Sequence, residues 1–187
     1  KTWCSLMKKI LIILFFFFLI SETSASIKDK IIQNLKTTDN LIFNFEQNVS
    51  GKTQNGKCAL SFPKKIFCEY NLKNNKILVS NGKSIVIKTK TSYYLYPLKS
   101  TPLNLILNKN FLLNKIKNLN ARIIDNKFVN FKFFEKDFEI NIFFDFNNYN
   151  LIGLQTTDIY QNLSITFLSS IKKNQKINDN LFILPKK

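Results

Sequence analysis

Two cysteines ten residues apart are the side chains whose chemistry most needs an explanation. Cys58 and Cys68 stand symmetrically about Pro63 in the stretch NGKCALSFPKKIFCEY. Such a pair could ligate a metal, act as a redox couple, form a disulfide or remain as free thiols. Two ligands do not complete a zinc site, and the chain has no histidine to add. The spacing also differs from a Cys-x-x-Cys redox motif, so a disulfide and two free thiols remain as the alternatives.

The composition gives little support to an enzyme. Without histidine, Ser-His-Asp and Cys-His catalysis are excluded. Carboxylates are few, and Glu135, Asp137 and Glu139 alternate as residues on one solvent face of a strand pair would. The four glycines are isolated, so the chain has no phosphate-binding loop. We expect no enzymatic activity, no metal and no cofactor.

The first part of the chain has the pattern of a signal peptide. Lys8 and Lys9 precede an apolar run over residues 10–20, which is followed by Thr23-Ser24-Ala25. The run is shorter than the roughly 20 apolar residues that a membrane-spanning helix needs, so a permanent anchor is the weaker alternative. Met7 is the expected initiator, and residues 1–6 are interpreted as upstream readthrough. Residues 7–25 are thus the predicted signal peptide, and residues 26–187 are predicted to be a single exported domain.

The chain is strongly basic, with a formal charge of +16. The first 25 residues hold three lysines and one glutamate, which leaves +14 for the remainder. Lysine, asparagine, isoleucine and phenylalanine are all abundant, as in an AT-rich genome, and Arg122 is the only arginine. Proteins that read nucleic acids usually use arginine forks, so we expect no nucleic-acid partner.

The apolar pattern predicts a mainly β (α+β) protein. Spacing of four predicts an amphipathic helix over residues 26–35, and spacing of two predicts strands from Leu41 onward. Asn81-Gly82 favours a hairpin turn. Two short apolar helices are expected over residues 101–107 and 111–116, followed by strands between residues 121 and 168 and by a last strand or an edge extension at LFILP. A sheet of so many antiparallel strands must curl, and the helices would cover its mouth.

Nineteen phenylalanines accompany this pattern. They fit an ordinary aromatic core, but a curled sheet covered by apolar helices also suits an elongated acyl chain. Burial of such a chain gains roughly 0.8 kcal/mol per methylene.

Five landmarks occur in order along the first half of the mature chain. They are the amphipathic helix, FEQ at residues 45–47, Gly56, the strand ending in FPKKIFCEY, and ILVSNGKSIVI followed by YPLKSTPLNLIL. This order resembles the LolA family of periplasmic outer-membrane lipoprotein carriers. The family pattern is F-x-Q, a glycine, R-P-x-x-F/M-x-W/F-E-Y, IVSDGK and PL..TPL..LL. The resemblance extends to about Leu107, and beyond it only the strand rhythm is similar.

The resemblance implies an incomplete, strongly bent antiparallel β-barrel of about ten strands with a short α-helical lid. It implies a carrier that receives acylated lipoproteins from an inner-membrane ABC transporter and delivers them to the outer membrane, where a receptor is an optional further partner. No bond is made or broken, and a monomer is expected. By position, the residues that would bind the acyl chains are Phe43, Phe45, Leu60, Phe62, Ile66, Tyr70, Ile77, Leu103, Ile106 and Leu107.

The chain departs from the family pattern within the cysteine-containing hairpin. Phe62 stands where the family usually has an arginine that hydrogen-bonds the lid, so here the lid would be held by packing. Cys68 stands where the family commonly has tryptophan or phenylalanine. The basic surface is also unusual, and it could assist contact with an anionic membrane or an acidic transporter surface.

The hairpin register bears on the state of the two cysteines. With Pro63 near the tip, Cys58 pairs with Cys68 in one antiparallel register, and both point to the same face. Directly opposed residues have Cα atoms about 4.5–5.5 Å apart, inside the disulfide range. In an oxidising periplasm a disulfide is favoured, with two free thiols as the alternative.

Two other functions are compatible with the same fold. An outer-membrane receptor for lipoproteins would itself need a lipid-accepting cysteine, and none follows the apolar run. A periplasmic regulatory protein that senses lipids or peptides in its cleft remains the alternative. Bound acylated protein would support the carrier, whereas bound bare peptide would support the sensor.

Overall fold

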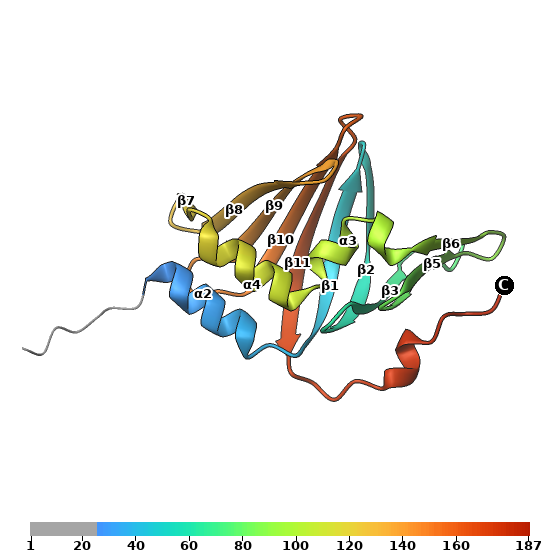
Figure 1. Ribbon diagram of the computed structural model, residues 1–187. Helices are drawn as coiled ribbons and strands as arrows, with labels where there is room; N and C mark the ends of the chain where they lie inside the picture. Colours follow the sequence, from blue (N-terminus) through green and yellow to red (C-terminus); the bar gives the residue numbers. More distant parts are fainter. Residues whose placement is uncertain (1–25) are drawn as a thin grey trace, which may run out of the picture.

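An open antiparallel sheet of eleven strands forms the body of the protein in a computed structural model that describes residues 26–187 (Figure 1). The strands are β1 (Asn40–Val49), β2 (Lys52–Ser61), β3 (Lys65–Tyr70), β4 (Ile77–Asn81), β5 (Ser84–Lys88), β6 (Tyr93–Pro97), β7 (Arg122–Ile124), β8 (Phe128–Glu135), β9 (Phe138–Asp145), β10 (Leu151–Asp158) and β11 (Leu163–Lys173). The predicted signal peptide lies outside the described residues.

The strand order is β6-β5-β4-β3-β2-β1-β11-β10-β9-β8-β7. The chain builds one half of the sheet from β1 outward to β6, and then builds the other half from β7 inward to β11. Pairing of β1 with β11 joins the halves, while β6 and β7 are edge strands that do not pair with each other. The predicted unclosed, mainly β fold is thus confirmed, with eleven strands in place of about ten.

Five short helical segments accompany the sheet within residues 26–187. They are α2 (Ile27–Lys36), the 3₁₀ turn η1 (Leu98–Ser100), α3 (Leu103–Ile106), α4 (Lys109–Asn118) and the 3₁₀ turn η2 (Asp179–Phe182). Ser26 and Asp29 form a capping box at the start of α2, which satisfies amide groups that the first turn leaves free. Within residues 26–187, no helix combines the length and the apolar character needed to cross a membrane.

Helices α2 and α4 cover the inner face of the β8–β9 half of the sheet (Figure 1). The apolar stripes of both helices pack against alternate residues of these strands. Phe131 and Phe144 are almost fully buried there, with ring centroids 5.9 Å apart in an edge-to-face arrangement. This packing forms one core, and a second core, which includes Phe43, Leu60 and Leu107, lies between β1–β3 and the end of α3.

The outer face of the other half of the sheet is covered by the C-terminal segment. We expected LFILP to extend a sheet edge, but this expectation was wrong, because its first two residues end η2 and pack on β3 and β4. Phe182 is buried there, as are Val79 and Val86 of β4 and β5. Lys65 forms an ion pair with Asp179 at 3.3 Å. The segment therefore braces the half of the sheet that α2 and α4 do not cover.

Candidate functional site

A cavity of about 190 Å³ lies between the inner face of the sheet and α3. Its walls come from both halves of the sheet, through β1–β4 on one side and β10 and β11 on the other. The lining is Phe43, Phe45, Gln47, Cys58, Leu60, Ile66, Cys68, Tyr70, Leu78, Pro102, Leu103, Ile106, Leu107, Leu151, Leu154, Thr156, Ser164, Thr166 and Leu168. Most of these side chains are aliphatic or aromatic, so the cavity suits an apolar ligand.

Eight of the ten side chains proposed to bind acyl chains lie in the cavity lining, and two do not. Ile77 does not, because β4 pairs Leu78 with Cys68 and therefore turns Leu78 to the inner face. Phe62 also lies outside the lining, since it packs between the two cores at the end of β2. On β4 the cavity is thus lined by Leu78, one residue from the predicted Ile77.

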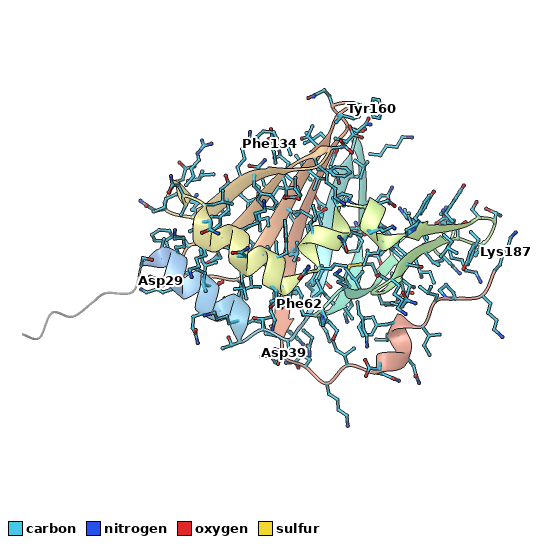
Figure 2. The ribbon with its side chains drawn as sticks, in the orientation of Figure 1. Asp29, Asp39, Phe62, Phe134, Tyr160 and Lys187 are labelled. Carbon is cyan, nitrogen blue, oxygen red and sulfur yellow. A yellow bond between two sulfur atoms is a disulfide. The ribbon has the colours of Figure 1, made fainter. Side chains whose placement is uncertain are left out.

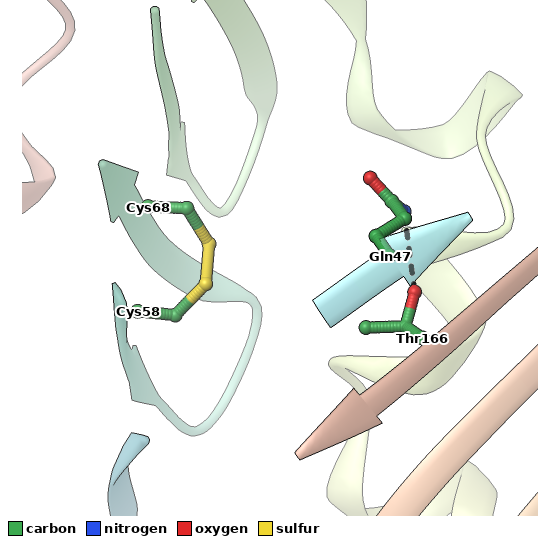
Figure 3. The surroundings of a disulfide bond; sticks show 4 residues. All are labelled: Gln47, Cys58, Cys68 and Thr166. Atoms are coloured by element: carbon green, nitrogen blue, oxygen red, sulfur yellow. Dashed lines mark hydrogen bonds between the residues drawn. A yellow bond between two sulfur atoms is a disulfide. The ribbon is translucent and has the colours of Figure 1, made fainter. Parts of the chain in front are cut away.

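Cys58 and Cys68 are joined in a disulfide that lines the cavity (Figure 3). They are directly opposed in the β2–β3 register, with Cα atoms 4.1 Å apart. Figure 3 shows the two sulfur atoms directed from the hairpin toward the side of the cavity that holds Gln47 and Thr166. Cys68 stands where the LolA pattern commonly has tryptophan or phenylalanine, so a compact disulfide lines the cavity at this position.

Two aromatic rings form one corner of the cavity, and a lysine packs against one of them. Gly56 lies between Phe45 and Tyr70 in the strand register, and the two rings meet edge to face at 4.9 Å. The Lys76 Nζ atom lies 4.0 Å from the centroid of the Tyr70 ring and donates to the side chain of Gln54 at 2.8 Å. Burial raises the pKa of Tyr70 and lowers the pKa of Lys76. Tyr70 therefore contributes a neutral phenol to the lining at neutral pH.

A small polar group lies where β1 meets β11. The Gln47 amide nitrogen donates to the hydroxyl oxygens of Thr166 at 3.2 Å and Ser164 at 3.4 Å. Thr156, on the neighbouring strand, also lines the cavity. An amphiphile could place its polar linkage here while its chains contact the apolar walls.

Sequence reasoning missed the wall formed by β10 and β11, because the motif resemblance ends near Leu107. The alternation of Ser164, Thr166 and Leu168 was a usable signal for β11. On β10 the register shifts between Leu151 and Gly153, which breaks the alternation there.

The end of α3 is held by a backbone hydrogen bond as well as by packing. The amide of Lys64, in the β2–β3 turn, donates to the carbonyl of Leu107 at 2.9 Å. Phe62 packs beside this contact, at the position of the family's arginine. The expectation of packing alone was thus incomplete, since the hairpin turn also supplies a polar contact to this end of α3.

Lys109, at the start of α4, makes a second polar connection that the sequence did not reveal. Its Nζ atom donates to the carbonyls of Lys36 at 3.2 Å and Thr38 at 3.0 Å. It also lies 3.1 Å from a carboxylate oxygen of Asp39 and 5.7 Å from the Phe62 ring centroid. These contacts fasten the segment that follows α3 to the end of α2.

Replacement of Lys109 with methionine is expected to lower the free energy of unfolding by about 1–2 kcal/mol, because two carbonyls lose a charged donor. Urea unfolding followed by circular dichroism measures this change. Lys117→Met is the matched control on the same helix, because Lys117 is exposed and forms no ion pair within residues 26–187. Equal destabilisation by both variants would contradict the role given to Lys109.

Two of the three carboxylates considered earlier, Glu135 and Glu139, take part in ion pairs. Glu135 lies 2.9 Å from Lys115, and Glu139 lies 2.9 Å from Lys132. The hydrogen bond from Lys132 is the main reason that the pKa of Glu139 lies below its usual value. No group of three or more potential metal-ligating side chains occurs in the described part of the chain.

Comparison with solved structures identifies proteins of similar fold. An uncharacterized conserved protein from Thermus thermophilus matches with a TM-score of 0.51 and 8% identity, covering 86% of this chain and 93% of the other. A LolA superfamily protein from Nitrosomonas europaea matches at 0.45 and 8%, covering 84% and 96%. A putative outer membrane lipoprotein-sorting protein domain from Vibrio parahaemolyticus matches at 0.46 and 10%, covering 82% and 95%.

Comparison with protein sequences identifies the family. A search of curated proteins found no significant match. The sequence model of the family described as "Outer membrane lipoprotein carrier protein LolA" matches residues 29–184, which include all eleven strands and the cavity lining. The chain therefore belongs to the LolA family.

Proposed function

We propose that this protein is a periplasmic carrier that binds the acyl chains of lipoproteins released from the inner membrane and delivers them to the outer membrane. The observation that supports this proposal is the apolar cavity between α3 and an unclosed sheet. Family membership suggests the same role. The activity is binding and transfer, with no chemical step.

The energetics of transfer follow from the lining. Each methylene exposed to water would cost roughly 0.8 kcal/mol, so burial in the cavity offsets the cost of taking an acyl chain out of the membrane. The cavity volume of about 190 Å³ is below the roughly 300–1,000 Å³ of typical ligand pockets. We therefore propose that loading enlarges the cavity, by movement of α3 away from the sheet.

Three kinds of partner are expected for such a carrier. Acylated lipoproteins are the cargo, an inner-membrane ABC transporter supplies them, and an outer-membrane receptor is an optional acceptor. The disulfide fits an extracytoplasmic compartment, where cysteine pairs remain oxidised.

Release of a lipoprotein from inner-membrane vesicles tests the proposal. Vesicles that contain the matched transporter and a labelled lipoprotein are incubated with ATP and the purified protein. We expect labelled cargo in the supernatant as a complex, and native mass spectrometry should show an acylated protein bound. Absence of release by folded protein would reject the carrier, and capture of only unacylated peptide would favour the sensor.

A variant that fills the cavity should separate acyl binding from folding. Leu103→Trp enlarges a cavity-lining side chain of α3 by a volume of about two methylenes. A bound acyl chain would therefore bury about two fewer methylenes. We expect cargo affinity to fall about tenfold or more. Displacement of a fluorescent fatty acid measures this affinity.

The matched control places the same residue outside the cavity. Leu181 belongs to η2 and is partly exposed, so Leu181→Trp should leave fatty-acid affinity unchanged. Equal affinity of the Leu103→Trp variant and the unchanged protein would show that the ligand binds elsewhere.

A further inference from the structure

One end of the molecule carries an unusual concentration of positive charge. Between Tyr70 and Ile124 the chain has ten lysine or arginine residues and no aspartate or glutamate. Five lysines from this segment and the C-terminus meet at the far end of the β5–β6 hairpin. We call them the basic end: Lys73, Lys88, Lys90, Lys186 and Lys187.

Backbone contacts place these lysines together. The amide of Lys90 donates to the carbonyl of Asn74 at 2.9 Å, which brings the β5–β6 turn against the loop that holds Lys73. The Nζ atom of Lys88 donates to the carbonyl of Lys186 at 2.7 Å. Figure 2 shows Lys187 at this end of the hairpin, while Tyr160 marks a strand tip elsewhere on the molecule.

The charges of the basic end are not neutralised by carboxylates. None of its lysines takes part in the ion pairs found within residues 26–187. Glu69 lies on β3, two strands away from Lys88 in the register. The lysine side chains of the basic end therefore have no side-chain carboxylate partner within residues 26–187.

Exposed aromatic and aliphatic side chains adjoin these lysines on the edge strand β6. Tyr94, Leu95 and Tyr96 are 50%, 57% and 45% exposed. The rings of Tyr94 and Tyr96 stack with centroids 6.4 Å apart. Tyrosine beside leucine and lysine is the combination that favours the interface between water and lipid.

The inner face of the sheet connects this edge to the cavity. Cys68 pairs with Leu78, Leu78 with Ile87, and Ile87 with Tyr94, so these residues form one row across four strands. Cys68 and Leu78 line the cavity, and Tyr94 is exposed at the edge. A partner in contact with β6 would thus lie at the exposed end of this row of side chains, and the other end of the row lines the cavity.

We propose that the basic end and β6 dock on an anionic phospholipid bilayer. Lysines supply attraction to the headgroups, which falls off over a Debye length, while Tyr94 and Leu95 enter the interfacial region. An acidic protein surface would use the charge but would not require the exposed tyrosine and leucine. This docking does not depend on the identity of the cavity's ligand.

Co-sedimentation with vesicles tests the docking. The chain starting at Ser26 is used, because the apolar run at residues 10–20 would itself bind lipid. We expect binding to vesicles of phosphatidylethanolamine with phosphatidylglycerol, weaker binding as salt is raised, and no binding to phosphatidylcholine. The triple variant Lys73→Gln, Lys88→Gln, Lys90→Gln should reduce the partition coefficient about 100-fold.

Two further variants make the test specific. Lys52→Gln, Lys117→Gln, Lys127→Gln removes the same charge from exposed lysines elsewhere and should leave binding nearly unchanged. Leu95→Ser should weaken binding about tenfold, because less apolar area enters the interface. Circular dichroism melting confirms that each variant is folded.

Several outcomes would overturn the proposal. They are absence of binding to the anionic vesicles, equal loss in the two triple variants, and binding to polyglutamate without binding to vesicles. The last would assign the basic end to an acidic protein partner. Lipoprotein release in the earlier assay can succeed or fail independently of these results.

Discussion

Replacement of Gly56 with alanine is expected to lower the free energy of unfolding by about 3 kcal/mol. A Cβ atom at this position would overlap the backbone carbonyl oxygen of Glu69 and lie 2.8 Å from Cε1 of Phe45. The carbonyl belongs to β3, which is paired on both sides and cannot retreat without disturbing β2 or β4. The Phe45 ring cannot retreat freely either, because it packs against Tyr70.

Urea unfolding of the Gly56→Ala variant measures this effect, with Gly153→Ala as the control. At Gly153 the nearest atom to an added Cβ is Cβ of Phe143 at 3.5 Å, an ordinary van der Waals contact. The control should change stability by less than about 1 kcal/mol. If the two variants were equally stable, the close approach of β2 to β3 would not be essential.

The same substitution should also reduce fatty-acid affinity in those molecules that still fold. Phe45 and Tyr70 both line the cavity, so displacement of either ring changes the shape of its wall. Gly56 is thus required for the close packing of two strands and for the position of the cavity's aromatic corner.

Removal of the disulfide is expected to lower the free energy of unfolding by about 2.5 kcal/mol. The bridge closes a short loop, since the sequence separation is 10, and in the chain-entropy description its effect arises mainly in the unfolded state. Cys58→Ala/Cys68→Ala is preferred to serine, because the pair lines an apolar cavity where unsatisfied hydroxyls would add a second cost.

Urea unfolding of the double variant, and of the unchanged protein with and without reductant, measures the contribution. The reduced protein should approach the stability of the double variant. Mass spectrometry after alkylation provides the control, because the oxidised protein should carry no modified thiol at Cys58 or Cys68. Two readily alkylated thiols in protein purified from the periplasm would contradict the bridge.

Much of the fold could be predicted because local signals and tertiary packing agree. Strict alternation from Leu41 to Phe45 assigned the buried face of β1, and Pro63 fixed the register that opposes the two cysteines. The capping residue Ser26 marked the start of α2. Each of these signals operates over a few residues, so no knowledge of distant contacts was needed.

The remaining features depend on contacts between distant parts of the chain. LFILP has the composition of a strand, but its first residues pack as a 3₁₀ turn on β3 and β4, which no local pattern specifies. Ile77 and Leu78 are adjacent apolar residues, so only pairing with Cys68 decides which of them faces the cavity. Lys109 is one lysine among many until the fold brings the end of α2 beside it.

The unpaired edges β6 and β7 give the sheet a mechanical property that a closed barrel lacks. A closed barrel widens only by breaking a ladder of interstrand hydrogen bonds, whereas two halves hinged at β1 and β11 can splay with every strand pair intact. The enclosed volume is then set by how far the halves separate. Under the proposed function, one sequence would in this way accommodate acyl chains that differ in number and length.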